Sequence, residues 1–271
     1  MEIKGATAVV TGAASGIGHA VSVELARRGA KMVALVDRSS SVGESAEQIK
    51  REWKTDVLYF TGDATDPDFR KHIFDAISKM YGPVSICVPA AGITDDALAV
   101  KMNKNTGEAE IYPLETFRKV VEVDFIAPIY WALETVAGIA KSRMQQNLKR
   151  WTRDEPIQGV IVFLGSVSSI GVKGQIAYSS SKAGLEGAAA TLSKEAIYHG
   201  VQCSIIHPGF TDTPMVRALG EGYIRTHILP YTQLGRLIRP DEIADAICFM
   251  ISNSTVTGHL WADAGWHPSA A

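Results

Sequence analysis

The sequence has few cysteines, almost no net charge and no long uninterrupted apolar run. Its three cysteines lack metal-ligand spacing and lie in apolar stretches, so we expect buried free thiols and a reducing cytoplasm. A formal net charge of −2, without a basic block, gives no support for nucleic-acid binding. We find no secretory signal before the first expected strand and no run long enough to span a membrane. The 271 residues suit one large α/β domain or two small ones.

Apolar β-type runs alternate with helical patterns along most of the chain. The first run, residues 6–10, is followed by Ile17, Val21 and Leu25 at a helical period, and Gly29 can end that helix. Further strands are expected at residues 32–36, 57–60, 84–88, 159–164, 201–206 and 259–262. Such a pattern predicts a doubly wound parallel sheet covered on both faces, with ligands bound at the carboxyl ends of its strands.

Two polar segments interrupt this alternation. Residues 101–112 contain the turn signal Asn105-Thr106-Gly107, and residues 143–158 are charged and are expected to extend a helix before looping back. Surface decoration is the favoured interpretation of both. The first segment follows the carboxyl end of a strand, so it could also border a substrate cleft.

A glycine-rich turn, residues 11–18, joins the first expected strand to the first helix. Gly12, Gly16 and Gly18 lack a Cβ atom, so the chain can turn sharply and its N–H groups can approach a pyrophosphate at the helix N-terminus. A plain strand–helix turn is the alternative. The strand before it and the periodic helix after it favour a dinucleotide site.

Asp37 closes the second expected strand, nineteen residues after Gly18. A carboxylate there can accept hydrogen bonds from the ribose hydroxyls of adenosine and would repel a 2′-phosphate, which favours NAD over NADP. Arg38 points the other way, because a guanidinium can pair with that phosphate. Ser15, where a basic residue would help to bind NADP, restores the preference for NAD.

Tyr178 and Lys182 lie one helical turn apart, and Ser166 precedes Tyr178 by twelve residues. A phenol titrates at a pKa of about 10, too high for a base at neutral pH, and a nearby cation lowers that value. Residues at i and i+4 share a helix face, so this contact follows from the spacing. Ser166 can present a hydroxyl to a carbonyl or alcohol oxygen. The three therefore indicate proton transfer beside a nucleotide.

With these motifs the chain resembles the short-chain dehydrogenase/reductase family from Gly5 to Gly265. The resemblance is carried by the glycine turn, Asp63, Ala90-Ala91-Gly92, Ser166, Tyr178 to Lys182, Pro208 to Thr213, and Arg236 to Ile243. It implies one Rossmann-type NAD(P)-binding domain over residues 1–271, with strand order 3-2-1-4-5-6-7. It also implies a homotetramer or homodimer that contacts its copies near Asp124, Tyr178 and the C-terminal segment.

The resemblance also implies residue roles. Tyr178 would be the general acid/base, Lys182 would hold the nicotinamide ribose and lower the phenol pKa, and Ser166 would bind the substrate oxygen. The residues expected to bind the cofactor are Gly12, Ala14, Ser15, Gly16, Ile17, Gly18, Asp37, Arg38, Asp63, Ala64, Ala90, Ala91, Gly92, Tyr178, Lys182, Pro208, Gly209, Thr211 and Thr213.

The chain departs from the family pattern in three places. Asp124 stands where the family has an asparagine of its proton relay; we count it as catalytic and expect it to alter the pH optimum of oxidation. Pro89 replaces an asparagine and cannot donate an N–H, so the strand end must be satisfied differently. The interval from serine to tyrosine is one residue short, which leaves Ser168 as the alternative to Ser166.

The favoured function is an NAD-dependent oxidoreductase that interconverts a secondary alcohol and a ketone. An NADPH-dependent ketoreductase like 3-oxoacyl-carrier-protein reductase is the alternative, and a nucleotide-binding regulator without catalysis is the alternative from another class. The lid region, residues 215–234, could supply substrate contacts through Tyr223, Ile224 and Leu229, as could Leu98, or these could simply pack on helices. No metal is expected, because the histidines, among them His199, His207, His259 and His267, lack ligand spacing.

Overall fold

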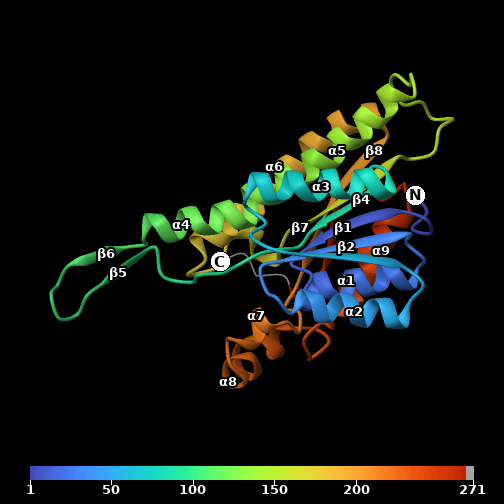
Figure 1. Cartoon of the computed structure of the whole chain (residues 1–271). Coiled ribbons are helices and arrows are strands. Elements are labelled where there is room, and N and C mark those ends of the chain that lie inside the picture. The colour runs from blue at the N-terminus through green and yellow to red at the C-terminus, as the bar shows by residue number, and fades with distance from the viewer. Residues whose placement is uncertain (267–271) are drawn as a thin grey trace.

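A parallel sheet of seven strands forms the centre of the structure, a computed structural model that describes residues 1–266 (Figure 1). The strand order, β3-β2-β1-β4-β7-β8-β9, confirms the expected order, because β5 and β6 stand outside this sheet. The strands are β1 (Thr7–Thr11), β2 (Met32–Asp37), β3 (Asp56–Thr61), β4 (Ile86–Pro89), β7 (Gly159–Leu164), β8 (Val201–Pro208) and β9 (Gly258–Ala262). The order reverses between β1 and β4, which is where α/β sheets of this kind bind ligands.

Helices cover both faces of the sheet (Figure 1). One face carries α1 (Gly16–Arg27), α2 (Val42–Glu52) and α9 (Pro240–Ser252), and the other carries α3 (Pro67–Tyr81), α5 (Ala127–Gln145) and α6 (Ile176–Glu195). Adjacent residues of a strand point to opposite faces, so Val10 packs in the core on the α1 side and Val9 in the core on the α5 side. This double burial explains why the strands read as continuous apolar runs.

A long, nearly continuous helical stretch leads from the surface into the sheet layer. It consists of α4 (Leu114–Val121), the π-helical turn η1 (Glu122–Ile126) and α5. By length and composition residues 114–145 could cross a bilayer, but Trp131, Ala132 and Ile139 are buried in the core, as in any helix that covers a sheet. The π-helical turn brings Asp124 to a fully buried position.

Both polar insertions lie at the surface. The first forms an antiparallel hairpin of β5 (Val100–Met102) and β6 (Ala109–Ile111), which projects away from the sheet beside α4 (Figure 1). The second continues α5 to Gln145 and then loops back, held by an ion pair of 2.6 Å between Arg143 and Glu155. The expectation that it extends a helix is confirmed.

Short helical segments complete the edge of the sheet. Two 3-10 turns are η2 (Val167–Ile170) and η3 (Ala196–His199). After β8 come α7 (Pro214–Arg217), α8 (Glu221–Tyr223), a π-helical turn η4 (Ile224–Ile228) and a 3-10 turn η5 (Leu229–Tyr231). The last four form a small lobe with its own core around Ile224, Ile228 and Leu237.

Candidate active site

A cleft of about 760 Å³ opens at the carboxyl ends of the central strands. Eighteen of the nineteen residues expected to bind the cofactor line it, all but Ala14, and so does Ser166. They come from six strand ends, those of β1, β2, β3, β4, β7 and β8, and from the segments that follow them. The parallel sheet thus brings together motifs that lie far apart in the sequence.

The glycine turn leaves no room for side chains. Gly12 and Gly16 adopt positive φ angles of 65° and 56°. A Cβ atom on Gly12 would lie 2.8 Å from the Ala91 backbone, and one on Gly18 would lie 2.7 Å from the Gly12 carbonyl carbon. The turn is therefore a cradle of bare backbone at the start of α1, which suits a pyrophosphate.

The Asp37 carboxylate lines the cleft and is held by two backbone N–H groups. One oxygen accepts a hydrogen bond of 3.0 Å from the Ala14 N–H, and the other accepts one of 2.9 Å from the Ser39 N–H. Ala14 therefore contributes its backbone N–H, which positions the Asp37 carboxylate. Arg38 also lines the cleft. Asp37, which favours NAD, and Arg38, which favours NADP, are therefore neighbours in the cleft lining.

Pro89 ends β4 and has no N–H to donate. The side chain of Thr11 supplies a hydrogen bond to the backbone at this strand end instead. Thr11 pairs with Pro89 across the sheet, and its hydroxyl accepts a hydrogen bond of 3.0 Å from the Ala91 N–H. The strand end is thus satisfied by a side chain, as its sequence requires.

Lys182 is buried between three groups. Its Nζ donates to the Leu164 carbonyl at 3.1 Å, lies 3.4 Å from an Asp124 carboxylate oxygen and stands 5.4 Å from the centre of the Tyr178 ring. Burial favours the neutral amine, but Asp124 and Tyr178 outweigh it and raise the pKa of Lys182. The ammonium ion is therefore stable inside the protein.

Burial raises the pKa of the Tyr178 phenol above its ordinary value. Lys182 lowers that pKa, as expected, and Ser166 does so by hydrogen bonding, whereas Asp124 raises it. The net shift is opposite to the expected one, because desolvation is the largest contribution. A protonated phenol at neutral pH is the form that can donate a proton.

Ser166 and Ser168 both line the cleft and are both buried. The Ser166 hydroxyl accepts a hydrogen bond of 3.0 Å from the Ser168 N–H, so it caps the turn η2. The accepting oxygen keeps its proton for another partner. We favour Ser166, because hydrogen bonding by its side chain is among the influences that lower the pKa of Tyr178.

Asp124 does not line the cleft. It lies behind Gly92, accepts a hydrogen bond of 2.8 Å from the Ile93 N–H and contacts Lys182. Burial raises the pKa of Asp124, although Lys182 acts in the opposite direction. It acts on the cleft through its contact with Lys182 and through its charge, which raises the pKa of Tyr178, so it is a positioning residue in this arrangement.

The rest of the cleft lining consists largely of residues that the sequence did not single out one by one. Apolar side chains dominate, and the added lining residues include Ile93, Thr94, Lys119, Val167, Gln175, Phe210, Met215, Val216 and Leu219. None of the four suggested contacts, Leu98, Tyr223, Ile224 and Leu229, lines the cleft. Ile224 packs in the core of the lobe instead. One sequence signal could have pointed to Met215. The pair Thr213-Pro214 marks the start of a helix, and the Thr213 hydroxyl does cap α7, the helix that contains Met215.

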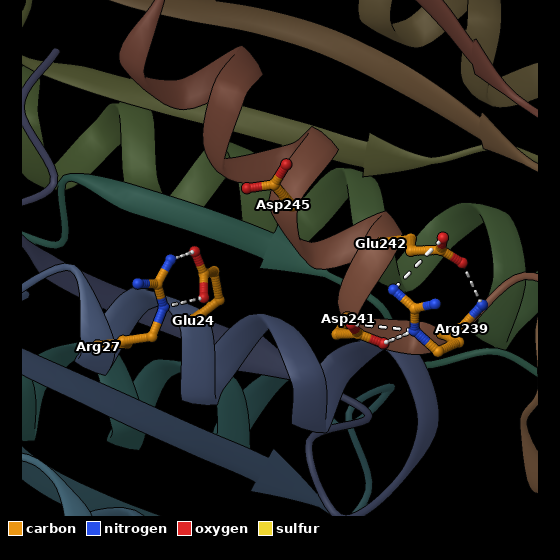
Figure 2. A pocket seen from close by; sticks show the side chains of 6 residues that line it. All are labelled: Glu24, Arg27, Arg239, Asp241, Glu242 and Asp245. Atoms are coloured by element: carbon orange, nitrogen blue, oxygen red, sulfur yellow. Dashed lines mark hydrogen bonds and ion pairs between the residues drawn. The ribbon is translucent and has the colours of Figure 1, made fainter.

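A second hollow lies between α1 and α9 (Figure 2). Its side chains pair with one another: Glu24 with Arg27 at 2.6 Å, and Arg239 with Asp241 at 3.1 Å. Its other two carboxylates, Glu242 and Asp245, pair with Arg236 and Arg28, so this hollow is a surface ion-pair groove.

Comparison with known proteins gives relatives over the whole cleft-forming region. The family model described as short chain dehydrogenase matches residues 6–223. The chain is 31% identical to the 3-oxoacyl-[acyl-carrier-protein] reductase FabG of Escherichia coli (strain K12), covering 95% of each chain. It is 29% identical to an acetoacetyl-CoA reductase of Allochromatium vinosum, covering 92% of each. A crystal structure of a short-chain type dehydrogenase/reductase from Mycobacterium marinum superposes with a TM-score of 0.82 at 23% identity, covering 98% of this chain and 97% of the other.

Proposed function

Because the chain belongs to the short-chain dehydrogenase family and is an oxidoreductase of hydroxyl and keto groups, we propose that it interconverts 3-oxoacyl and 3-hydroxyacyl thioesters with NAD(H). The thioester class is suggested by the E. coli and A. vinosum relatives, both named for the reduction of such compounds. The apolar substrate end, with Phe210, Met215 and Leu219, suits an acyl chain. This puts the ketoreductase alternative ahead of a general secondary-alcohol dehydrogenase.

The side chains around the glycine turn fit a nicotinamide dinucleotide. The bare backbone of Gly12 and Gly16 would receive the pyrophosphate, and Asp37 would accept the adenosine ribose hydroxyls. When bound, the cofactor supplies or accepts the hydride. The fixed carboxylate of Asp37 supports NAD(H), and Arg38 is the feature that supports NADP(H).

The proton is handled by Tyr178. In reduction its phenol donates a proton to the substrate oxygen while the Ser166 hydroxyl donates a hydrogen bond to the same oxygen. Lys182 stabilises the phenolate that this leaves. In oxidation the phenolate takes the alcohol proton. The single observation that carries the proposal is that Ser166, Tyr178 and Lys182 line the same cleft as the glycine turn.

The test is an assay of the purified full chain with acetoacetyl-CoA and, separately, with simple ketones and sugars. NADH and NADPH are compared through the loss of their absorbance. We expect kcat/KM to be highest for the thioester with NADH. Turnover of simple ketones alone would refute the thioester class, and a preference for NADPH would refute the role of Asp37. No turnover of any substrate would favour the regulator.

The whole chain is proposed to form one domain, to assemble as a homodimer or homotetramer, and to act in the cytoplasm. The assembly is supported by exposed apolar side chains on α5, including Tyr130 and Leu133. The location is supported by Cys87, Cys203 and Cys248, which are buried free thiols.

A further inference from the structure

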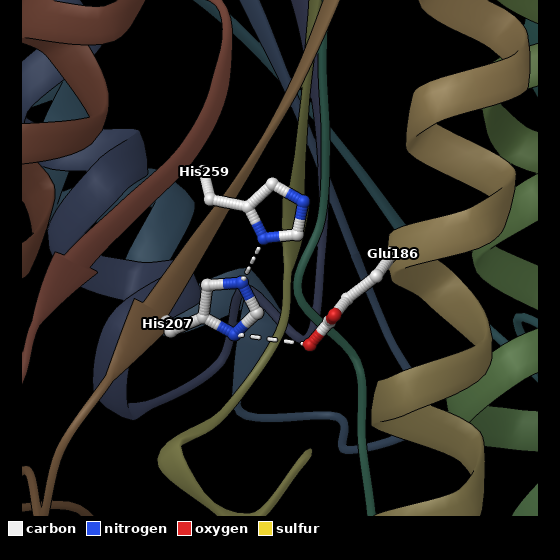
Figure 3. A group of neighbouring side chains, drawn as sticks. All are labelled: Glu186, His207 and His259. Atoms are coloured by element: carbon white, nitrogen blue, oxygen red, sulfur yellow. Dashed lines mark hydrogen bonds and ion pairs between the residues drawn. The ribbon is translucent and has the colours of Figure 1, made fainter. Parts of the chain in front are cut away.

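Three possible metal ligands meet beneath the edge of the sheet, outside the cleft (Figure 3). Glu186 comes from α6, His207 from β8 and His259 from β9, and one ligand atom of each lies within 4.8 Å of the others. Their positions in the sequence give no metal spacing. They are brought together by the parallel pairing of β8 with β9, in which His259 stands opposite Ile205, two residues before His207.

His207 is held in a defined orientation. Its Nδ1 lies 3.2 Å from the Ser166 carbonyl oxygen, and the Trp261 ring stacks on it with centroids 4.2 Å apart. A carbonyl can only accept, so Nδ1 carries the proton and Nε2 presents a lone pair. That Nε2 lies 3.0 Å from His259 Nδ1. A carbonyl that orients an imidazole through its other nitrogen is the usual support of a metal-binding histidine.

The third group completes a plausible ligand set. A Glu186 carboxylate oxygen lies within 4.8 Å of a ligand atom of each histidine, and its side chain is a third exposed, so it can turn toward an ion. His259 is exposed as well, so an ion can reach the group from solvent. Two imidazoles and one carboxylate are a common set for Zn²⁺ and leave a fourth position for water.

We propose that Glu186, His207 and His259 form a binding site for a divalent transition metal of the zinc class. His207 would bind through Nε2, His259 through Nδ1 and Glu186 through one carboxylate oxygen. For this, the His259 proton moves from Nδ1 to Nε2, so both rings remain neutral. Tetrahedral Zn–N bonds of about 2.0–2.1 Å place the two nitrogens about 3.3 Å apart. The exposed His259 ring can supply this small opening from 3.0 Å.

A bound ion would lie next to the active site without entering it. His207 contacts the carbonyl of Ser166, whose hydroxyl faces the cleft. The ion would therefore fix the backbone at the end of β7.

The experiment measures zinc binding to the full chain, stripped of metal by a chelator and free of affinity tags. Zn²⁺ is titrated against a chromophoric competitor, and Co²⁺ is added separately to record the visible bands of a tetrahedral site. Variants are His259→Gln, Glu186→Gln and, as matched control, His72→Gln, an exposed histidine of α3. Circular dichroism checks that each is folded.

We expect one zinc ion per chain in the wild type and in His72→Gln, and affinity weaker by about tenfold or more in the other two variants. Zinc should raise the melting temperature of the wild type and not that of His259→Gln. Equal zinc affinity in wild type and both ligand variants would overturn the site, as would a wild type that binds no stoichiometric zinc. In either case the histidines form only a hydrogen-bonded pair. If one ligand variant does not fold, the other decides.

Discussion

Asp124 is the single residue whose chemistry differs most from what the family pattern leads one to expect. A buried carboxylate beside Lys182 keeps the ammonium charged, and it also raises the pKa of Tyr178. It thus offsets part of the decrease in the Tyr178 pKa that Lys182 causes. The burial of Tyr178 acts in the same direction, so the site holds a proton donor at neutral pH. That suits reduction better than oxidation.

Replacing Asp124 with Asn should shift the pH profile. Removing the negative charge lowers the pKa of Tyr178, so phenolate forms at lower pH. The rising limb of the oxidation rate and the falling limb of the reduction rate should both move to lower pH. The measurement is log kcat/KM against pH in both directions. Asp154→Asn, at an exposed loop position, is the control. Superimposable profiles for Asp124→Asn and wild type would contradict the assigned role.

Single substitutions distinguish the roles of Ser166 and Ser168. Ser166→Ala should lower kcat by about 10²–10³-fold, the usual cost of losing a donor to the reacting oxygen. Ser168→Ala should have a much smaller effect, because Ser168 supplies its backbone N–H to Ser166 and keeps that group as alanine. Steady-state kinetics of both variants decide. A larger loss in Ser168→Ala would exchange their roles.

The strand–turn–helix unit of β1 and α1 is the element that builds the cofactor site. Gly18→Ala places a methyl group against the Gly12 carbonyl inside the turn. We expect the free energy of unfolding to fall by about 1–3 kcal/mol, as for other overpacked sites. We also expect weaker cofactor binding. Thermal melting with and without NADH measures both.

Gly138→Ala is the matched control for this change. Beyond its own stretch of helix, no heavy atom of the described residues lies within 4 Å of a Cβ at Gly138 in α5, so a helical alanine should stabilise the chain by about 0.5–1 kcal/mol. If Gly18→Ala has the same melting temperature as the wild type, the turn can accept a methyl group at this position and the prediction is wrong.

The strands of the sheet and the helix α1 are predictable from sequence, and the surface hairpin is not. Strands buried on both faces read as apolar runs, so all seven were found and residues 159–164 agree to the residue. The hairpin of β5 and β6 escaped because its strands are three residues long, polar in part and exposed. Its turn signal at Asn105-Thr106-Gly107 was visible, and Gly107 does adopt a positive φ of 73°.

The site divides in the same way. Motifs that follow strand ends, such as Gly12 after β1 and Ser166 after β7, converge because parallel strands share one edge. The place of Asp124 behind the cleft depends on the π-helical turn η1, which no residue pattern announces. The meeting of His207 with His259 depends on strand register. Side chains of the lobe, such as Ile224 and Met215, turn inward or outward according to packing within it.

The assembly of whole molecules is expected to use the outer face of α5. Leu133→Glu places a charge on an exposed apolar position there and should reduce the mass in solution toward the 29.2 kDa monomer. Met80→Glu, an equally apolar and more exposed position on α3, should leave the mass unchanged. Analytical ultracentrifugation measures both. A monomeric wild type, or loss of assembly only in Met80→Glu, would refute this interface.

The proton-transfer role of Tyr178 is tested most directly by removing one oxygen atom. In Tyr178→Phe the ring still fills its place beside Lys182, while the proton donor is gone. The measurement is kcat/KM for acetoacetyl-CoA reduction, together with the dissociation constant of NADH by fluorescence. We predict a rate lower by about 10²–10⁴-fold with NADH still bound. A variant that reduces the thioester at the wild-type rate would contradict the account.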